Sequence, residues 1–358
     1  MNVSYGLIST SELLKERDPD GSYTFSGITQ KNFLGIEESS GREAALSELS
    51  NRIHHNLNLT ENIIEFLPKI NVFHYRISSS IFGLISDFSD SLNLSIDDLP
   101  DNLKILSKIR SIGLIARQNN VTLSVYPDSS NSLLSSDDTD IERATNELNF
   151  HSWFFETAGF PSNASNPIII KPFSDPASRS HDSAVSAVKT FYNNFKRLND
   201  ETQKRIAIQN QDSGFWDCVN LFKYFHVYLN EKFGDGMVLS YYNIADSKNP
   251  GSFGADKVEP EVNIGAFHET WMGVVPVFVW SEKDAKGLST EYLSKPIPDF
   301  NYSIKWECDV RKRDKAIIKY TMPEEEDKVT EEVIMAITKN KYKKSRDASR
   351  AFNAIYDS

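Results

Sequence analysis

The chain is poor in the features that mark several common protein classes. Its 358 residues include two cysteines, Cys218 and Cys308, too few for a disulfide framework or a cysteine-rich zinc site. No run of about 18 apolar residues is present, so no membrane span is predicted. The first residues lack a basic segment followed by a long apolar one, so no signal peptide is predicted. These absences predict a cytoplasmic protein in a reducing compartment.

Basic residues are in the minority, because 39 Lys and Arg stand against 50 Asp and Glu, which gives a net charge of −11. Such a charge repels polyanions at long range and lowers the expectation of nucleic-acid binding. A local basic face can outweigh the average. The candidates for such a face are Arg76, Lys171 and the cluster of Arg311, Lys312, Arg313 and Lys315. The chain also has no phosphate-binding Gly-x-x-x-x-Gly-Lys-Ser/Thr loop, which argues against a P-loop ATPase.

Short apolar runs alternate with longer helical patterns, which indicates repeated βα units and a parallel sheet. The expected strands are Val3 to Ile8, Val72 to Ile77, Val121 to Tyr126, Ile168 to Ile170, Ile206 to Ile208, Met237 to Leu239, Val274 to Trp280 and Ile304 to Glu307. The polar segment from Ser9 to Gly41 is expected to be a long loop. We therefore predict a TIM-type (β/α)8 barrel over residues 1–320.

A helical extension is predicted for residues 321–358, as a tail packed on or extending from the barrel. Acidic residues follow Pro323, and basic residues gather between Lys339 and Arg346. Acid near the start of a helix and base near its end both suit the helix dipole. A surface helix is the simpler interpretation, and a basic patch for phosphate or an acidic partner is the alternative.

Several segments, taken in order, resemble a known family. They are His74 to Ser80 (His-Tyr-Arg-Ile-Ser-Ser-Ser), Glu147 to His151, Asn194 to Leu198, Gln209 to Asp212, Asn249 to Gly251, and Trp306-Glu307. This ordered set resembles the UV-damage endonucleases, a branch of the xylose isomerase-like TIM barrels. The resemblance implies an enzyme that holds divalent metals such as manganese at the C-terminal mouth of its barrel. It also implies cleavage of DNA on the 5′ side of an ultraviolet photoproduct.

The resemblance implies where the metal ligands should stand, and most of them are replaced. The positions are Tyr126, Lys171 and Asn243 in place of His, Gln209 in place of Glu, Ser240 in place of Asp, Val279 in place of His and Val277 in place of Lys. Only Glu307 keeps its carboxylate, which makes it the one candidate catalytic residue. A protonated ammonium at Lys171 would repel a metal ion. We therefore expect no metal cofactor in this chain.

The candidate site is a set of ligand-binding side chains at the barrel mouth: Arg76, Tyr126, Lys171, Gln209, Asn210, Asn243, Trp280 and Glu307. Within it, Lys171 is predicted to pair with Glu307 or to hydrogen-bond Gln209. His74 and Arg76 are expected to share one face of their strand. His74 and His151 are interpreted as buried or partly buried histidines, and His268 is expected near the mouth.

Four functions stay open. The first is a DNA-repair-related barrel that binds without cutting. The second is an active nuclease whose metal is held by a rearranged set (Asp87, Asp128, Asp212, His268 and Glu307). The third is a barrel that binds or modifies a sugar or nucleotide, since fold does not fix function. The fourth is a module whose acidic surface binds a protein partner.

Overall fold

A computed structural model describes the parts of the chain that form the barrel. These are residues 3–16, 23–86, 92, 94–127, 133–211, 214–244, 260–281, 283–284, 287–288, 297, 301–309, 314, 317–318 and 321. The extension predicted for 321–358 therefore lies outside the described residues, apart from Thr321. Asp87, Asp128, Asp212 and the basic cluster from Arg311 to Lys315 also lie outside them.

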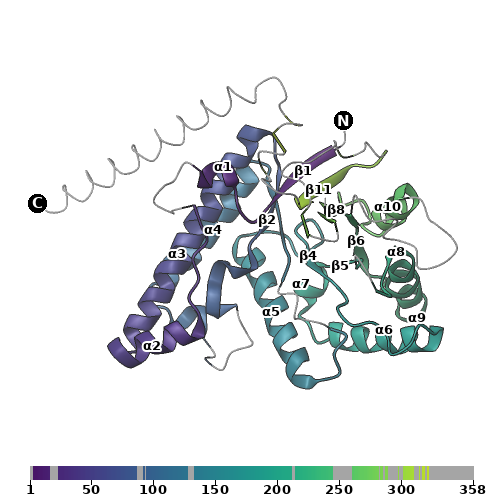
Figure 1. Cartoon of the computed structure of the whole chain (residues 1–358), viewed down its shortest axis with the longest axis horizontal. Helices are drawn as coiled ribbons and strands as arrows, with labels where there is room; N and C mark the ends of the chain where they lie inside the picture. The colour runs from purple at the N-terminus through teal and green to yellow at the C-terminus, as the bar shows by residue number, and fades with distance from the viewer. Residues whose placement is uncertain are drawn as a thin grey trace, which may run out of the picture.

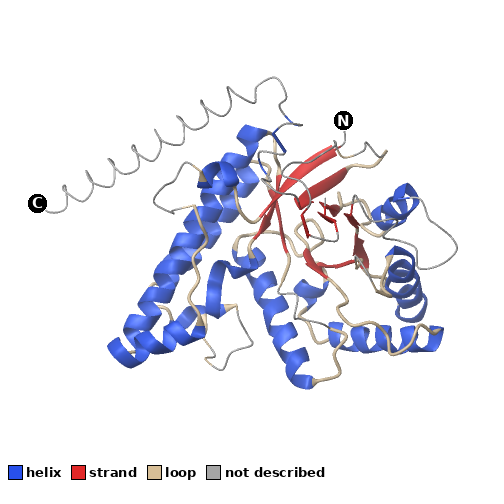
Figure 2. Cartoon of the chain, in the orientation of Figure 1, coloured by secondary structure: helices blue, strands red, loops and turns tan. Residues whose placement is uncertain are grey.

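Parallel strands form the centre of the molecule, and helices surround them (Figure 2). The strands of the main sheet are β1 (Val3–Ile8), β2 (His74–Ile77), β3 (Thr122–Val125), β4 (Ile168–Ile170), β5 (Ile206–Gln209), β6 (Val238–Ser240), β7 (Tyr242–Ile244), β8 (Val277–Ser281) and β11 (Ile304–Asp309). Their order is β6-β5-β4-β3-β2-β1-β11-β8-β7, with parallel pairing throughout. All eight strands expected from the sequence are confirmed, with small shifts at their ends.

The sheet closes on itself through β6 and β7, which only Tyr241 separates along the chain. The first segment pairs with β5 and the second with β8, so together they act as one barrel strand. The backbone N–H of Val279 donates to the carbonyl of Tyr241 at 2.8 Å, which completes the closure. The result is the predicted eight-stranded TIM-type barrel.

The helices cover the outside of the barrel (Figure 1). The α-helices are α1 (Glu12–Lys15), α2 (Gln30–Ser40), α3 (Arg42–Phe66), α4 (Asn102–Gln118), α5 (Asp138–Thr157), α6 (His181–Phe195), α7 (Asp200–Gln203), α8 (Cys218–Leu221), α9 (Leu229–Phe233) and α10 (Pro260–Glu269). Short 3-10 segments are η1 (Leu67–Ile70), η2 (Ser79–Ile85) and η3 (Ile96–Asp98), and the π-helical η4 (Phe222–Tyr228) joins α8 to α9. A two-stranded ribbon pairs β9 (Lys283–Asp284) with β10 (Gly287–Leu288).

The expectation of a long loop from Ser9 to Gly41 was wrong, because α1 and α2 lie within it. Their N-caps are Ser11, whose side chain accepts from the Leu14 N–H, and Thr29, which accepts from the Asn32 N–H. These caps satisfy orphan donors of the first turn. Each helix buries little apolar surface, so polar residues outnumber the buried ones and hide the helical pattern.

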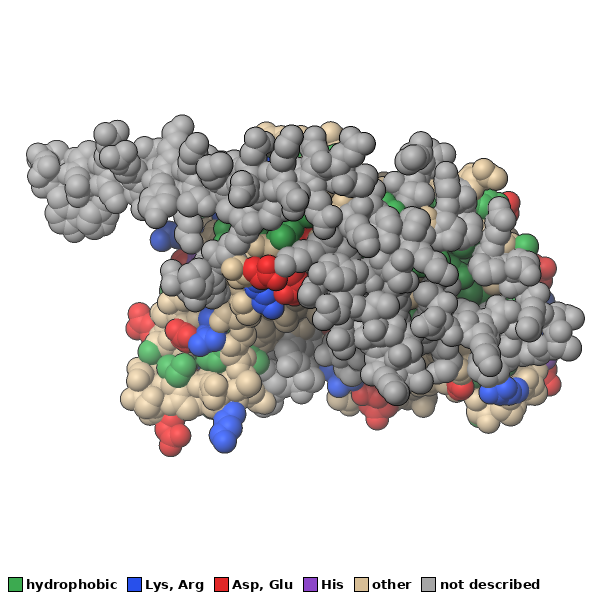
Figure 3. All heavy atoms as spheres, turned by 45° about the horizontal axis from the view of Figure 1, so that its top comes forward, with side chains coloured by type: hydrophobic (Ala, Val, Ile, Leu, Met, Phe, Trp, Pro, Cys, Tyr) green, Lys and Arg blue, Asp and Glu red, His purple; other side chains and the backbone are tan. Residues whose placement is uncertain are grey.

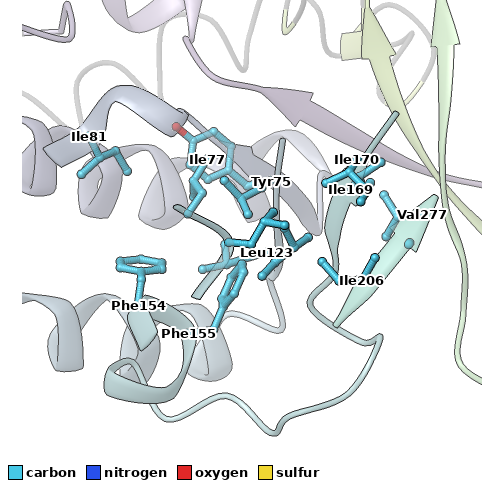
Figure 4. Packing of buried hydrophobic residues seen from close by; sticks show 14 of the residues in the cluster. Tyr75, Ile77, Ile81, Leu123, Phe154, Phe155, Ile169, Ile170, Ile206 and Val277 are labelled. Atoms are coloured by element: carbon cyan, nitrogen blue, oxygen red, sulfur yellow. The ribbon is translucent and has the colours of Figure 1, made fainter. Parts of the chain in front are cut away.

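The core lies between the strands and the covering helices. Side chains of β2 and β3 that point outward, such as Tyr75, Ile77 and Leu123, lie beside Phe154 and Phe155 of α5 (Figure 4). Each of these is buried. Because successive side chains of a strand alternate between faces, their neighbours point into the barrel. That alternation places His74, Arg76 and Ser124 inside.

Candidate functional site

The candidate site is built around Glu307, which β11 points into the barrel and which is 0% exposed. The neighbouring strand β1 places Gly6 beside both Glu307 and His74 in the strand register. A Cβ at Gly6 would lie 2.8 Å from Cδ2 of His74, closer than a real contact allows. The glycine therefore leaves the space through which the imidazole on β2 reaches the carboxylate on β11.

Three side chains donate hydrogen bonds to Glu307. Nε2 of His74 lies 3.0 Å from Oε1, the hydroxyl of Ser124 also donates to Oε1, and Nη2 of Arg76 donates to Oε2. Burial alone would raise the pKa of the Glu307 carboxyl, but the Arg76 charge and the bonds from His74 and Arg76 outweigh it. They lower this pKa to about 2, so the carboxylate is ionised at neutral pH.

His74 serves the network as a neutral donor. Burial lowers the pKa of its imidazole, and the bond to Glu307 only partly opposes that effect. Because the ionised carboxylate only accepts, Nε2 carries the proton and Nδ1 is the acceptor. The hydroxyl of Thr122 lies 2.9 Å from Nδ1 and holds the ring from the other side. The predictions that His74 is buried and shares a face with Arg76 are confirmed.

The opposite side of the barrel interior carries a neutral network. Nε2 of Gln209 lies 3.3 Å from the hydroxyl of Ser240, which in turn donates to the carbonyl of Val277 at 2.8 Å. Asn210 is fully occupied by the backbone of Tyr242, accepting from its N–H at 2.7 Å and donating to its carbonyl at 3.1 Å. These amides tie β5 to the barrel closure.

Two cations and a second carboxylate lie nearer the mouth. The guanidinium of Arg76 lies 5.3 Å from the ring centroid of Tyr126, and Nζ of Lys171 lies 4.2 Å from that of Tyr242. Asp309 accepts from the hydroxyl of Ser281 at 3.2 Å, and the Tyr242 hydroxyl lies 3.5 Å from it. Asp309 was not singled out from the sequence, although its spacing of two from Glu307 places both on one face of β11.

The predicted pairing of Lys171 was wrong. The partners of Glu307 are Arg76, His74 and Ser124, and Gln209 bonds to Ser240. The ammonium of Lys171 instead lies over the Tyr242 ring. Arg76 reaches Glu307 because β1 alone separates their strands, whereas Lys171 follows β4, which lies four places from β11 in the sheet order.

Two further expectations need correction. His268 stands at the end of α10, where its ring lies 5.0 Å from that of Tyr302. A helix that leads into a parallel strand ends near that strand's start, so His268 lies away from the mouth. Trp280 packs against Trp306, with ring centroids 5.7 Å apart, on the face of β8 opposite to Val279 and Ser281. The side chain of Asn243 lies outside the described residues.

His151 is buried, as expected, within α5. Its Nε2 lies 3.5 Å from Oε1 of Glu147, one helical turn away. The motif from Glu147 to His151 is therefore a contact within a helix that covers the barrel. None of the interior side chains that surround Glu307 comes from this helix.

The fold and this polar interior define a TIM-type barrel with an ionic network at the carboxyl ends of its strands, the end where such barrels carry their sites. The chain matches the profile of the family described as UV-endonuclease UvdE over residues 3–249. It therefore belongs to the UV-endonuclease UvdE family. A comparison with curated protein sequences gives no match.

Solved structures show the same fold. The crystal structure of SacUVDE has 18% sequence identity, a TM-score of 0.67, and a match that covers 89% of this chain and 96% of that one. D-psicose 3-epimerase from Clostridium cellulolyticum H10 has 10% identity, a TM-score of 0.43, and a match covering 79% and 92% of the two chains. Among the described helices, none is long and apolar enough to cross a membrane.

The side chains at the described mouth do not fit the divalent metal that the family resemblance implies. A catalytic metal site needs several converging imidazole or carboxylate ligands. Within the described ranges, no group of three or more His, Cys, Asp and Glu residues is placed to hold a metal ion. Both oxygens of Glu307 already accept from protein donors, one of them the positively charged Arg76.

Proposed function

We propose that this chain is a DNA-repair-related barrel protein that binds damaged DNA at its barrel mouth without cutting it by a metal-dependent step. One observation carries the proposal: the retained carboxylate, Glu307, is held by Arg76, His74 and Ser124. A carboxylate held in this way has its lone pairs directed at protein donors rather than at an ion. On this proposal the protein acts by binding, inside the cell where DNA is found.

Charge supports a local contact rather than a broad one. On the face seen in Figure 3, the described basic and acidic side chains stand near one another, and no extended patch of one sign is visible. The net charge of −11 opposes long-range attraction of DNA. Arg76 and Lys171 at the mouth are therefore the groups that would contact a phosphate or an extruded base.

The first test measures incision. The purified protein is incubated with irradiated and undamaged duplex, with and without manganese, and its metal content is measured by elemental analysis. We expect no incision under either condition. Incision of irradiated duplex that requires manganese, together with bound metal, would show an active nuclease with a rearranged site and would overturn the proposal.

The second test measures binding by fluorescence anisotropy. We expect irradiated duplex to bind more tightly than undamaged duplex and the affinity to fall with added salt, because phosphate contacts release counterions. Lys171→Met should weaken binding. Arg197→Gln is the matched control, because Arg197 forms an exposed ion pair with Asp138 away from the mouth. Equal binding of irradiated and undamaged duplex would count against recognition of damage.

A further inference from the structure

The guanidinium of Arg76 has donor capacity that the protein does not use. Its Nη2 donates to Glu307, but its Nε–H is buried and has no hydrogen-bond partner. A buried donor without a partner costs free energy, which a bound acceptor would recover. The side chain remains 14% exposed, so one side of the guanidinium faces the mouth.

A second positive charge stands at the same end of the barrel. Lys171 follows β4, and Arg76 lies on β2, with β3 between them in the sheet. Adjacent strands lie about 4.8 Å apart, so these two long side chains start about 10 Å apart. Both cations lie over tyrosine rings, those of Tyr126 and Tyr242. An aromatic face under each cation holds it in place without neutralising it.

We propose that the mouth binds one oxyanion, such as a phosphate group, through Arg76 and Lys171 and without any metal ion. In this arrangement Arg76 performs two tasks. It compensates the buried charge of Glu307 with one nitrogen, and it offers its remaining N–H groups to the ligand as a planar fork, which suits phosphate geometry. Lys171 supplies the second charge. The inference rests on the mouth being a binding site but does not require that the ligand be DNA.

The carboxylate of Asp309 sets a limit on this site. It lies near the ring of Tyr242 that also carries Lys171, so it would repel a multiply charged anion. A singly charged phosphodiester is therefore favoured over a doubly charged phosphate monoester. Removal of this charge should reduce that preference.

The experiment titrates inorganic phosphate and dimethyl phosphate into the protein in the presence of EDTA, by calorimetry and by the shift of the melting temperature. We expect saturable binding of both anions, tighter for the diester. The variants are Lys171→Met and the charge-balanced double variant Arg76→Met/Glu307→Gln, each of which should weaken binding by at least about tenfold, the loss expected for a charge-assisted bond. Asp309→Asn should tighten binding of inorganic phosphate.

Arg197→Gln is again the control and should bind as the wild type does. Absence of saturable binding, equal affinity in all variants, or binding that appears only with added manganese would each overturn the inference. Should the double variant fail to fold by circular dichroism, Lys171→Met and Asp309→Asn decide, and unchanged affinities in both overturn it. Dimethyl phosphate binding without recognition of irradiated duplex would sustain this inference and remove the proposed function. The reverse pattern would do the opposite.

Discussion

The two sides of the barrel interior bury polar groups by different means. Around β2, β3 and β11 the network is ionic, with Glu307 paired to Arg76 and His74. Around β5, β6 and β7 it is neutral, with Gln209 and Asn210 bonded to a hydroxyl and to backbone groups. The first arrangement needs every partner, because a buried charge without compensation is costly. In the second, each hydrogen bond contributes by itself.

This difference bears on where function resides. An ionic network holds its members in fixed places and creates a strong local field, which suits recognition of a charged ligand. A neutral network of amides and hydroxyls fixes the strands together. We therefore place ligand recognition on the ionic side and barrel closure on the neutral side, and four predictions test that division.

The largest expected effect comes from Arg76→Met. It leaves Glu307 buried with only neutral donors, and breaking a buried pair in this way costs about 3–5 kcal/mol of unfolding free energy. The double variant Arg76→Met/Glu307→Gln removes both charges and should recover much of that loss. Urea unfolding followed by circular dichroism measures both. If the single and double variants are equally destabilised, the ionic network is not the source of the cost.

Acid should act next, and mainly on the ionic side. The pKa of Glu307 is lowered to about 2 from a model value of 4.5, so its contribution is complete above 4.5 and is lost as the pH falls toward 2. The pKa of His74 is also lowered, from 6.5, so stability begins to fall below pH 6.5 as the unfolded chain takes up a proton. Melting temperatures across this range should show both steps, and Glu307→Gln should remove the lower one.

On the neutral side, Asn210→Ala is expected to cost about 2–4 kcal/mol, because it leaves the N–H and carbonyl of Tyr242 buried without partners. Gln209→Met is the matched comparison. Gln209 makes one long bond, at 3.3 Å, and Ser240 keeps its bond to Val277, so the cost should stay below about 1.5 kcal/mol. Chemical denaturation ranks the two variants. A larger effect at Gln209 would assign closure of the barrel to the wrong amide.

The smallest effect concerns Lys305, which shares the inward face of β11 with Glu307. Burial lowers the pKa of its ammonium to about 8, so holding the charge costs stability at neutral pH. That cost falls as the pH rises from about 8 to the unfolded value of 10.5. Lys305→Met should therefore stabilise the protein by about 1–2 kcal/mol at pH 7, after allowance for partial exposure, and less at pH 10. Paired melting curves at the two pH values test this prediction.

Much of the fold and part of the site could be predicted from local patterns. Continuous β-branched runs such as Ile168 to Ile170 mark strands buried on both faces, and all eight barrel strands were found in this way. The spacing of two between His74 and Arg76 also placed them on one face. The same rule would have found Asp309, two residues beyond Glu307.

The partners of each side chain could not be read in the same way. The sequence determined which residues end each strand and which of them face inward, because alternation along a strand is a local property. Only the tertiary structure decided that Glu307 meets His74 across Gly6 and that Arg76, rather than Lys171, compensates its charge. Those contacts depend on which strands are neighbours in the closed barrel and on their register, and both are set by packing between segments far apart in the chain.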